Sequence, residues 1–535
     1  MRDRCALLSV YDKTGIEEFA RALADSGWKI FASGGTAATL EKAGIPTTDV
    51  ASLVGGGAIL GHRVVTLSRE IHAGLLARPV DEDLAELDSL GVPFIDLVCV
   101  DLYPLTDEIA RAGATRESVI EKTDIGGPTM LRSAAKGRRI VVSLPEQRGE
   151  VLAWLAAGEP DADAFRDALA AGAEAVIADY CLASARYHSR GDFDGFVARV
   201  TRTTKYGENA IQAPANLLDS GGADLLALER LELLAGTAPS YNNLAEVARQ
   251  IQTITHVAAA FERNPGAVPY IALGTKHGNC CGAAVNADDP IAAVRTMVMG
   301  DPRAIFGGLV MLNFPVTEEV AGELLTYGVP EGRRILDAVT APAFAPEAIA
   351  ALSRKGDKCR FLANPALSAL GVESLDATPM FRQVRGGYLR QPNYTWVPDL
   401  QGDDVTKTGE LSVAQQRDVL LAWAVCATSN SNTVTLVKGG GLVGNGVGQQ
   451  DRVGCCELAL KRARDAGHDP AGAVAASDSF FPHPDGPETL ITAGVAAIWA
   501  TSGSVRDEDT REVCRRAGVT LWQVPDAIGR GFFGH

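Results

Sequence analysis

Hydrophobic and polar residues alternate in blocks along the first part of the chain, residues 1–145. The segments 13–26 and 37–43 show the spacing of apolar positions that is typical of helices. Strands that alternate with helices form parallel sheets, so the pattern predicts that the chain begins with an α/β domain. Four short apolar runs have the length of buried strands, and they lie at 6–10, 28–32, 95–102 and 139–143.

The pattern changes near residue 200. Residues 163–188 are rich in alanine and have an amphipathic arrangement, which predicts one long helix. Residues 189–218 are mostly polar and include the turn-like tetrapeptide Tyr-Gly-Glu-Asn at 206–209. A polar segment of this kind is typical of a domain boundary, so we predict one domain over residues 1–199 and a second region over residues 200–535.

Strands and helices alternate again beyond residue 218. One apolar run ends at Lys276 and His277, and the small residues at 278–285 predict the start of a helix. No internal repeat is visible at the spacing of solenoid proteins. The predicted strands are 270–273, 433–437, 472–476 and 496–500, the predicted helices are 244–261, 413–426, 455–466 and 508–517, and shorter elements are expected at 342–351 and 362–369.

Composition places the chain among soluble globular proteins. The chain has 535 residues, of which 46% are hydrophobic and 22% charged, so we expect roughly two to four domains. A net charge of -16 disfavours binding to nucleic acid or to an anionic membrane, although a local basic pocket for an anionic small molecule remains compatible with it. No apolar run approaches the ~20 residues that cross a bilayer. We therefore predict a cytoplasmic protein without membrane contact.

The ten cysteines include two adjacent pairs, Cys280–Cys281 and Cys455–Cys456, and no Cys-x-x-Cys motif. Adjacent cysteines make poor disulfides, and no other spacing suggests a metal cage. Reduced thiols in a cytosol fit this pattern best, and we predict no metal site built by cysteine.

Lys276 and His277 are the first candidates for chemistry. A cation beside a titratable imidazole at the end of a strand suits acid–base catalysis. The alternative interpretation is a surface lysine next to a structural histidine.

Two polar loops follow the first two predicted strands. The second loop is rich in glycine and opens a helix, so its backbone N–H groups can approach an anion. In parallel sheets ligands bind at the carboxyl ends of strands, although an ordinary tight turn would have a similar sequence. The candidate phosphate-binding residues are Ser9, Asp12, Lys13, Thr14, Ser33, Gly34, Gly35 and Thr36, with Arg63 and Thr66 from a later loop.

A third group follows the third strand. Tyr103, Asp124 and Lys136 could converge to move protons, and the amides of Gly126 and Gly127 could bind an oxyanion. The alternative is turn chemistry alone, since an aspartate before Gly-Gly-Pro is common in loops. In the second region the candidate loops contain Phe306, Gly307, Asn432, Arg452 and Phe480.

Ten motifs occur in an order that resembles one known family, the bifunctional AICAR transformylase/IMP cyclohydrolases of purine biosynthesis. The likeness extends over essentially the whole chain. The motifs begin at Ser9, Ala32, Leu102, Asp124, Tyr206, Ser240, Lys276, Phe306, Ser431 and Ser477.

The resemblance implies an N-terminal cyclohydrolase domain with a methylglyoxal-synthase-like α/β fold. It implies a C-terminal transformylase region built from two cytidine-deaminase-like α/β units, and a homodimer. The cosubstrate would be 10-formyltetrahydrofolate, whose formyl group passes to the amine of an imidazole carboxamide ribotide before the purine ring closes. Whether a structural monovalent cation is bound is left open.

The resemblance also assigns roles to single residues. His277 would take the proton of the amine while the formyl carbon is attacked. Lys276 would stabilise the oxyanion or protonate the leaving folate nitrogen, and Asn432 would hold the carboxamide. Lys136, Tyr103 and Asp124 would move protons in ring closure. Further substrate contacts are implied at Lys205, Tyr206, Asn243, Phe306, Gly307, Arg452 and Phe480.

Several positions depart from the family pattern. A lysine of the cyclohydrolase site is replaced by Val65, the asparagine before Leu-Tyr-Pro is Asp101, and an arginine is replaced by Lys205. The proline and histidine that usually follow Tyr-Gly-Glu-Asn are Ala210 and Ile211, and the chain ends in residues 531–535 without the expected arginine unless Arg530 takes its place.

These departures leave three hypotheses. The leading one is a family enzyme that still transfers formyl and closes the ring. The second is a paralogue that acts on an analogue of the ribotide, for instance in making a purine-like nucleoside natural product. The third is a nucleotide-binding relic without catalysis. A zinc deaminase is disfavoured, because the His-x-Glu and Pro-Cys-x-x-Cys motifs are missing near His277.

Overall fold

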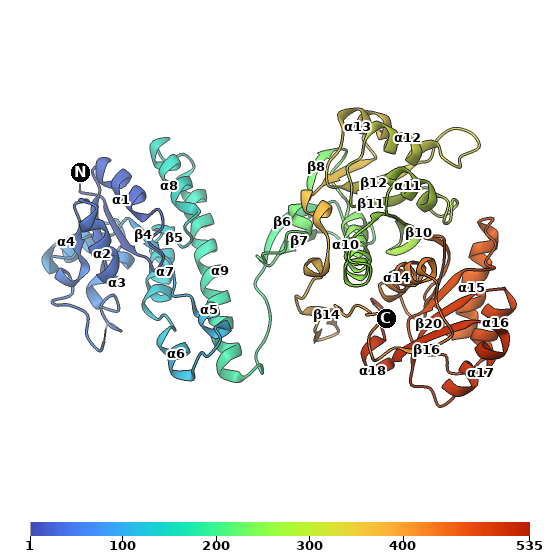
Figure 1. Ribbon diagram of the computed structural model, residues 1–535. Coiled ribbons are helices and arrows are strands. Elements are labelled where there is room, and N and C mark those ends of the chain that lie inside the picture. Colours follow the sequence, from blue (N-terminus) through green and yellow to red (C-terminus); the bar gives the residue numbers. More distant parts are fainter. Residues whose placement is uncertain (1, 62, 535) are drawn as a thin grey trace. The chain divides into compact units, whose positions relative to one another are not determined.

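The structure is a computed structural model that describes residues 2–61 and 63–534 (Figure 1). The chain divides into two compact units, Met1–Ala198 and Arg199–His535. Each unit has hydrophobic clusters of its own, formed only by residues of that unit. The two units are therefore described separately.

Unit 1 contains one parallel sheet in the order β3-β2-β1-β4-β5. Apolar residues of β1 and β4 are fully enclosed because helices lie on both faces of the sheet, as is usual for parallel strands. This sheet confirms the predicted parallel α/β domain. Its strands are β1 (Cys5–Ser9), β2 (Lys29–Ala32), β3 (Thr48–Asp49), β4 (Leu97–Val100) and β5 (Ile140–Val142).

The helices of unit 1 lie close to the predicted positions where the sequence was periodic. Helices α3 to α8 were not predicted. The bounds are α1 (Ile16–Asp25), α2 (Gly34–Lys42), α3 (Arg69–Leu76), α4 (Asp81–Leu90), α5 (Leu105–Ala110), α6 (Arg116–Glu121), α7 (Gly126–Lys136), α8 (Gln147–Ala156) and α9 (Ala162–Ser189), with a 3-10 turn, η1, at Val50–Ser52.

Helix α9 is long and apolar enough to cross a membrane, by length and composition only. This differs from the expectation that no segment would approach such a length. Its residues Leu169, Ala173 and Ile177 are buried, and the helix packs against α7 and β5. Only 17% of its apolar window is buried, so unit 1 by itself leaves much of this helix uncovered.

Unit 2 is organised around one sheet in the order β16-β21-β20-β19-β17-β18-β10-β9-β11-β12-β13-β8. Two small hairpins, β6–β7 and β14–β15, lie outside it. The strands are β6 (Arg199–Thr204), β7 (Ala215–Asp219), β8 (Glu232–Ala235), β9 (Tyr270–Lys276), β10 (Asn279–Asn286), β11 (Gly308–Leu312), β12 (Leu336–Ala341), β13 (Arg360–Ala363), β14 (Met380–Val384), β15 (Gly387–Gln391), β16 (Thr406–Thr408), β17 (Val434–Lys438), β18 (Gly441–Gly446), β19 (Val474–Ser477), β20 (Ala497–Ser502) and β21 (Thr520–Pro525).

Helices cover the sheet of unit 2, and α10 and α14 pack against each other in its largest core cluster. Both of these helices are buried over most of their length. The bounds are α10 (Tyr241–Arg263), α11 (Pro290–Val298), α12 (Glu318–Thr326), α13 (Pro346–Leu352), α14 (Val413–Ala427), α15 (Arg452–Asp465), α16 (Asp485–Thr492), α17 (Asp507–Ala517) and α18 (Asp526–Gly529), with 3-10 turns η2 (Leu228–Arg230), η3 (Pro365–Ala369) and η4 (Val372–Ser374).

Unit 2 contains the same arrangement of elements twice. The first repeat runs β8-α10-β9-β10-α11-β11-α12-β12-α13-β13, and the second runs β16-α14-β17-β18-α15-β19-α16-β20-α17-β21. In each repeat a hairpin is followed by three parallel strands and closed by an antiparallel edge strand. Figure 1 shows the first repeat in green to yellow and the second in orange to red.

One sequence prediction for unit 2 is wrong. Residues 278–285, expected to begin a helix, lie in the turn after β9 and in strand β10, which pairs with β9. The second part of the polar segment 189–218, for which no element was predicted, forms the hairpin β6–β7. Small residues such as those of β10 have weak preferences for either state, so the pairing with β9 decides the outcome.

Candidate active sites

The first two loops of unit 1 meet at the carboxyl ends of β1 and β2. The Ser9 and Ser33 hydroxyl oxygens are 2.6 Å apart, and the Val10 N–H donates to Thr36 Oγ1 at 3.1 Å. Lys13 Nζ donates to the Val10 and Tyr11 carbonyls, and its partial burial lowers the pKa of this amine. The hydroxyls, the amine and the start of α2 therefore line one polar site, as the phosphate prediction requires.

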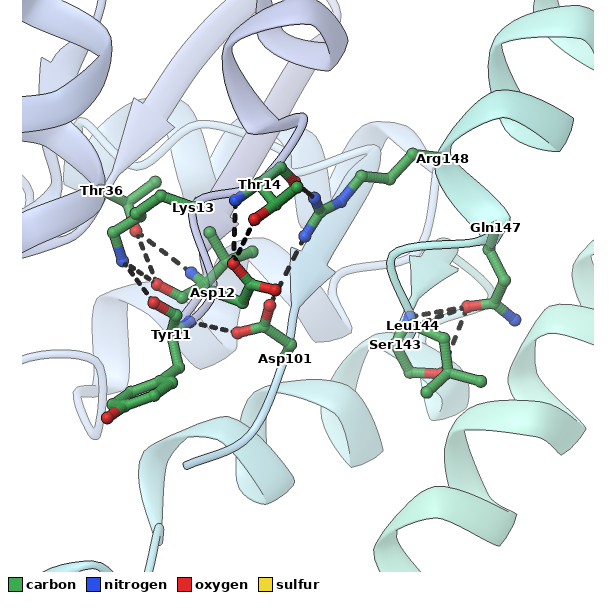
Figure 2. A network of polar contacts seen from close by, with 11 residues as sticks. Tyr11, Asp12, Lys13, Thr14, Thr36, Asp101, Ser143, Leu144, Gln147 and Arg148 are labelled. Carbon is green, nitrogen blue, oxygen red and sulfur yellow. Dashed lines mark hydrogen bonds and ion pairs between the residues drawn. The ribbon is translucent and has the colours of Figure 1, made fainter. Parts of the chain in front are cut away.

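Asp101 is held by a residue that sequence reasoning missed. The Arg148 guanidinium, from α8, lies 3.5 Å from Asp101 Oδ2 and donates to the Thr14 carbonyl at 2.6 Å (Figure 2). The Tyr11 N–H donates to the other carboxylate oxygen. Burial raises the pKa of Asp101, and these partners oppose that effect. The added negative charge at position 101 is therefore matched inside the site by Arg148.

Asp124 and the glycines after it form a closed turn. The Gly127 N–H donates to Asp124 Oδ1 at 2.9 Å, so this amide faces the carboxylate and not a ligand, unlike the expected oxyanion role. The Asp124 N–H in turn donates to the Tyr180 hydroxyl at 2.6 Å. Burial raises the pKa of Asp124, and it also raises the pKa of Tyr103, on which the Asp124 charge acts in the same direction. The raised pKa of Asp124 suits a group that exchanges a proton near neutral pH, whereas the raised pKa of Tyr103 keeps that phenol protonated.

The expected convergence of Lys136 with Tyr103 and Asp124 is not found within this unit. Helix α7 begins at Gly126 and ends at Lys136, and a helix of that length rises about 15 Å. Lys136 is exposed at its far end. Arg63, predicted to bind phosphate, has a protein partner instead: its guanidinium pairs with Glu121 at 2.7 Å. Thr66 is buried with its hydroxyl beside Gly126.

In unit 2, Lys276 and His277 lie at the tip of the β9–β10 hairpin. His277 and Gly278 have φ values of 55° and 72°, which is typical of a two-residue turn between right-twisted strands. Lys276 Nζ donates to the Phe306 carbonyl at 2.9 Å. The next residue, Gly307, donates to the Ile335 carbonyl at 2.7 Å and precedes β11. The turn therefore places Lys276 beside the Phe306–Gly307 loop.

Glu246, on α10, binds this turn and was missed by sequence reasoning. Its carboxylate faces the N–H groups of His277 and Gly278; burial raises its pKa, and those N–H groups oppose the rise. The second repeat has a carboxylate in the equivalent place. There Asp418, on α14, accepts the N–H groups of Gly439 and Gly440 at 2.9 and 2.6 Å.

The turn of the second repeat lacks an imidazole. Lys438 ends β17 as Lys276 ends β9, but Gly439 stands where the first repeat has His277. Lys438 Nζ donates to carbonyls of the loop before β19, at 2.6 Å for Ala471, much as Lys276 does to the loop before β11. Only the first hairpin therefore carries both candidate groups.

Two further predicted residues lie in the loops after α14 and β18. Asn432 Nδ2 donates to the Gln449 carbonyl at 2.9 Å, and the backbones of these residues are joined by two hydrogen bonds. Arg452, at the start of α15, pairs with Asp478, and both side chains are enclosed, with exposed fractions of 9% and 0%. Arg452 is thus held by a buried carboxylate, and a substrate contact there remains a prediction.

The loop with Lys205 and Tyr206 joins β6 to β7 and meets the start of α10, where Asn242 Nδ2 donates to the Glu208 carbonyl at 3.3 Å. Asn243 is the third residue of α10. Its side-chain oxygen accepts from Ser240 Oγ at 2.9 Å in a capping box, so that oxygen is used by the helix.

The C-terminal segment also approaches α10. Arg249 donates to the Thr428 carbonyl at 2.9 Å, and its guanidinium lies 4.6 Å from the Phe533 ring. Arg530 pairs with Asp526 at 2.5 Å and lies 6.0 Å from the Phe480 ring. Phe480 is half-buried, whereas Phe481 is in the core. Arg530 is therefore engaged within its own segment, and Arg249 is the cation that faces the end of the chain.

A cavity of about 360 Å³ opens beside the first hairpin. It lies between the two repeats, because residues of β10 and of β18 both line it. The polar lining of this cavity is formed by Lys276, His277, Asn279, Asp301, Asn445, Gln449 and Arg462.

Among the residues described, no group of three or more His, Cys, Asp or Glu could hold a metal ion.

A family model described as the AICARFT/IMPCHase bienzyme matches residues 134–462, and one described as the MGS-like domain matches residues 15–129. The bifunctional purine biosynthesis protein PurH of Cutibacterium acnes is 36% identical over 537 residues, which cover 97% of each chain. The PurH protein of Mycobacterium ulcerans is 35% identical over 97% of this chain and 96% of that one. This chain belongs to the PurH family. The family assignment confirms the resemblance and the fold class expected from the motifs.

One solved structure, titled as the crystal structure of ForH, is 35% identical and covers 36% of this chain and 100% of that chain, with a TM-score of 0.32. At that TM-score it adds nothing to the PurH assignment.

The residues that sequence reasoning missed are Arg148, Glu246 and Arg249. Each binds a backbone group or a side chain far away in the sequence, so no local motif marks it.

Proposed function

We propose that unit 2 transfers a formyl group from 10-formyltetrahydrofolate to the amine of an aminoimidazole carboxamide ribotide. The observation that carries this proposal is the tight hairpin turn that holds Lys276 and His277 at one edge of a cavity in a PurH-family chain. An aromatic amine is a weak nucleophile, so a base must take its proton as the formyl carbon is attacked. His277 is that base, and Lys276 stabilises the oxygen that becomes negative.

Unit 1 then closes the purine ring to the inosine nucleotide. Ser9, Lys13, Ser33 and Thr36 surround the place where the ribotide phosphate would bind, at the start of α2. Tyr103 and Asp124 exchange protons. The raised pKa of Asp124 favours this role, and the raised pKa of Tyr103 keeps the phenol protonated, so that it can donate. The residue assignments are proposals that rest on this geometry.

A second candidate is the same chemistry on an analogue of the ribotide. The observation that favours it is the altered polar network around Asp101, where Arg148 neutralises a carboxylate that the family pattern does not have. Val65 and the end of the chain at residues 531–535 also depart from that pattern. Changes at several substrate positions together are compatible with a different acceptor.

A turnover comparison tests both candidates. Purified protein is mixed with 10-formyltetrahydrofolate and either the standard ribotide or ring analogues of the same shape, and the products are followed by mass. Efficient conversion of the standard ribotide to inosine monophosphate supports the first candidate. Formylation and closure of an analogue, with poor conversion of the standard ribotide, supports the second. A His277→Ala protein that transfers formyl at the wild-type rate contradicts both.

Three further expectations accompany this function. A homodimer is supported by the apolar surface of α9, which unit 1 by itself leaves largely uncovered. A monovalent cation would fit near Asp478, because its buried Oδ2 has no hydrogen-bond partner among the described residues. A cytoplasmic location suits the supply of both substrates.

A further inference from the structure

An amine that sequence reasoning did not select lies beside the candidate site of unit 1. Lys122 follows the last residue of α6, and its Nζ lies 5.0 Å from the centre of the Tyr11 ring and 5.9 Å from that of Tyr103. The same Nζ lies 3.4 Å from the Tyr11 hydroxyl. The two rings meet edge to face at 5.6 Å. The ammonium is thus held over two aromatic rings at distances where cation–π attraction acts.

The backbone at Lys122 is fixed to the residues that follow it. The Lys122 N–H donates to the Ser118 carbonyl at 3.1 Å, and the Lys122 carbonyl accepts the Tyr180 hydroxyl at 3.2 Å. The same hydroxyl accepts the Asp124 N–H at 2.6 Å. One tyrosine of α9 therefore sets the positions of Lys122 and Asp124 together.

The loop that contains Val65 runs along this segment. Arg63, two residues before Val65, binds Glu121 at 2.7 Å, and the Thr66 hydroxyl lies 2.8 Å from the place of a Cβ atom on Gly126. Val65 itself packs against an apolar cluster of unit 1. The valine cannot supply the charge of the lysine that the family pattern has at this position. Lys122 projects from the segment that faces the same loop.

We propose that Lys122 supplies this missing positive charge and stabilises the formyl oxygen during ring closure. The proposal rests on the ring-closing function assigned to unit 1 above. In that step the carboxamide nitrogen forms a bond to the formyl carbon, and the formyl oxygen becomes negative. The carbon–oxygen bond then breaks, and the oxygen leaves as water with one proton from the carboxamide nitrogen and one from the formylamino nitrogen. An ammonium beside Tyr103 stabilises the negative oxygen while the protons move.

The position of Lys122 explains how the site can work without a lysine at 65 and with Lys136 at the far end of α7. The ammonium also acts on Tyr103, because the Lys122 charge opposes the effect of burial on the pKa of that phenol. A phenol that loses its proton more readily is the better partner for an amide nitrogen in this step.

The test measures ring closure of the formylated ribotide and formyl transfer in the same full-length preparation. We expect Lys122→Met to lower kcat for ring closure about 100-fold with little change in KM, and to leave formyl transfer unchanged. Lys122→Arg keeps the charge and should lose about tenfold or less. The matched control is Lys42→Met, an exposed lysine at the end of α2, which should change neither reaction.

A double variant tests directly whether a lysine at position 65 can replace Lys122. Adding Val65→Lys to Lys122→Met should restore ring closure by about tenfold or more, because the charge returns from the opposite side of the site. Ring closure in Lys122→Met at the wild-type rate, or a loss confined to KM, would overturn the inference. A wild-type protein that transfers formyl but closes no ring would instead refute the function proposed for unit 1.

Discussion

At the scale of single residues, the ion pair between Asp101 and Arg148 couples stability to the site of unit 1. The exposed fractions of the two side chains are 14% and 7%, and Arg148 also binds the loop that contains Thr14. Breaking such a pair from one side leaves an enclosed charge without a partner, which costs more than removing both charges.

We therefore expect Arg148→Met to lower the free energy of unfolding of unit 1 by about 3 kcal/mol. Asp101→Asn in the same chain should recover part of this loss, because it removes the unpaired carboxylate. Denaturant unfolding of the wild type, both single variants and the double variant gives the coupling energy. A double variant whose loss equals the sum of the single losses would show that the two side chains do not interact.

Asp124 links stability to pH. Its pKa is raised by burial, so the folded state disfavours the ionised carboxylate. The cost is fully present above the folded-state pKa. It shrinks as the pH falls through that value and vanishes below the ordinary value of about 3.8, where both states are protonated. Asp124→Asn removes that cost.

The Asp124→Asn protein should accordingly melt at a higher temperature than the wild type at pH 7, and the difference should shrink on acidification towards pH 4. Ring closure should fall about 100-fold, because the variant cannot exchange a proton. Thermal melts over a pH series and a ring-closure assay check both statements. A difference in melting temperature that widens in acid would contradict the assignment.

At the scale of elements, the two hairpins of unit 2 allow a matched comparison. Glu246 and Asp418 face the backbone N–H groups of equivalent turns, but only the Glu246 turn carries a histidine. Glu246 is half-buried on α10, and Asp418 is buried on the equivalent helix α14. The stability effect of such a contact can therefore be separated from its effect on catalysis.

We expect Glu246→Gln and Asp418→Asn each to cost about 1–2 kcal/mol of stability, since each weakens charge-assisted hydrogen bonds. Formyl transfer should fall at least about tenfold in Glu246→Gln, because His277 is no longer held in place, and should be unchanged in Asp418→Asn. Chemical unfolding and formyl-transfer kinetics on both proteins decide the matter. Equal losses of activity would show that the turn contact only stabilises the fold.

The sequence predicts elements well where periodicity is strong and poorly where partners are distant. The strand at β1 and the helix at α10 are marked by their apolar spacing. The tip of the β9–β10 hairpin is not marked in this way, because His277 adopts a positive φ that is uncommon for a residue with a side chain. The contact of Arg148 with Asp101 spans 47 residues, so only the tertiary fold reveals it.

Lys136 shows a different limit of sequence reasoning. A motif places Asp124 and Lys136 near each other in the chain, but a continuous helix carries them apart. The resemblance to a family names candidate residues, but it leaves the distances between them open. The polar loops of Ser9 and Ser33 were easier to predict, because adjacent parallel strands bring their carboxyl ends together.

At the scale of the whole molecule, the two units have separate cores and separate candidate sites. Apolar clusters of unit 1 contain no residue beyond Ala198, and those of unit 2 contain none before Arg199. Separate cores favour independent folding of the two parts.

Fragments 1–198 and 199–535 should therefore each unfold cooperatively when produced alone. The first should close the ring of a formylated ribotide, and the second should transfer formyl, each within about tenfold of the full chain. Circular dichroism melts and the two separate assays check this. A fragment that is unfolded by itself would show that its stability depends on the other unit.

The two repeats of unit 2 have a consequence for the evolution of the chain. A chain that contains one architecture twice can arise by duplication of a single segment, after which the copies are inherited together but selected for different reasons. If His277 acts as proposed, we expect selection for reactivity at its tip. At the tip with Gly439 and Gly440 we expect selection only for a backbone with positive φ and for the contact with Asp418. Drift should therefore be faster around the second tip, and that is where a new binding specificity could be acquired without loss of the first activity.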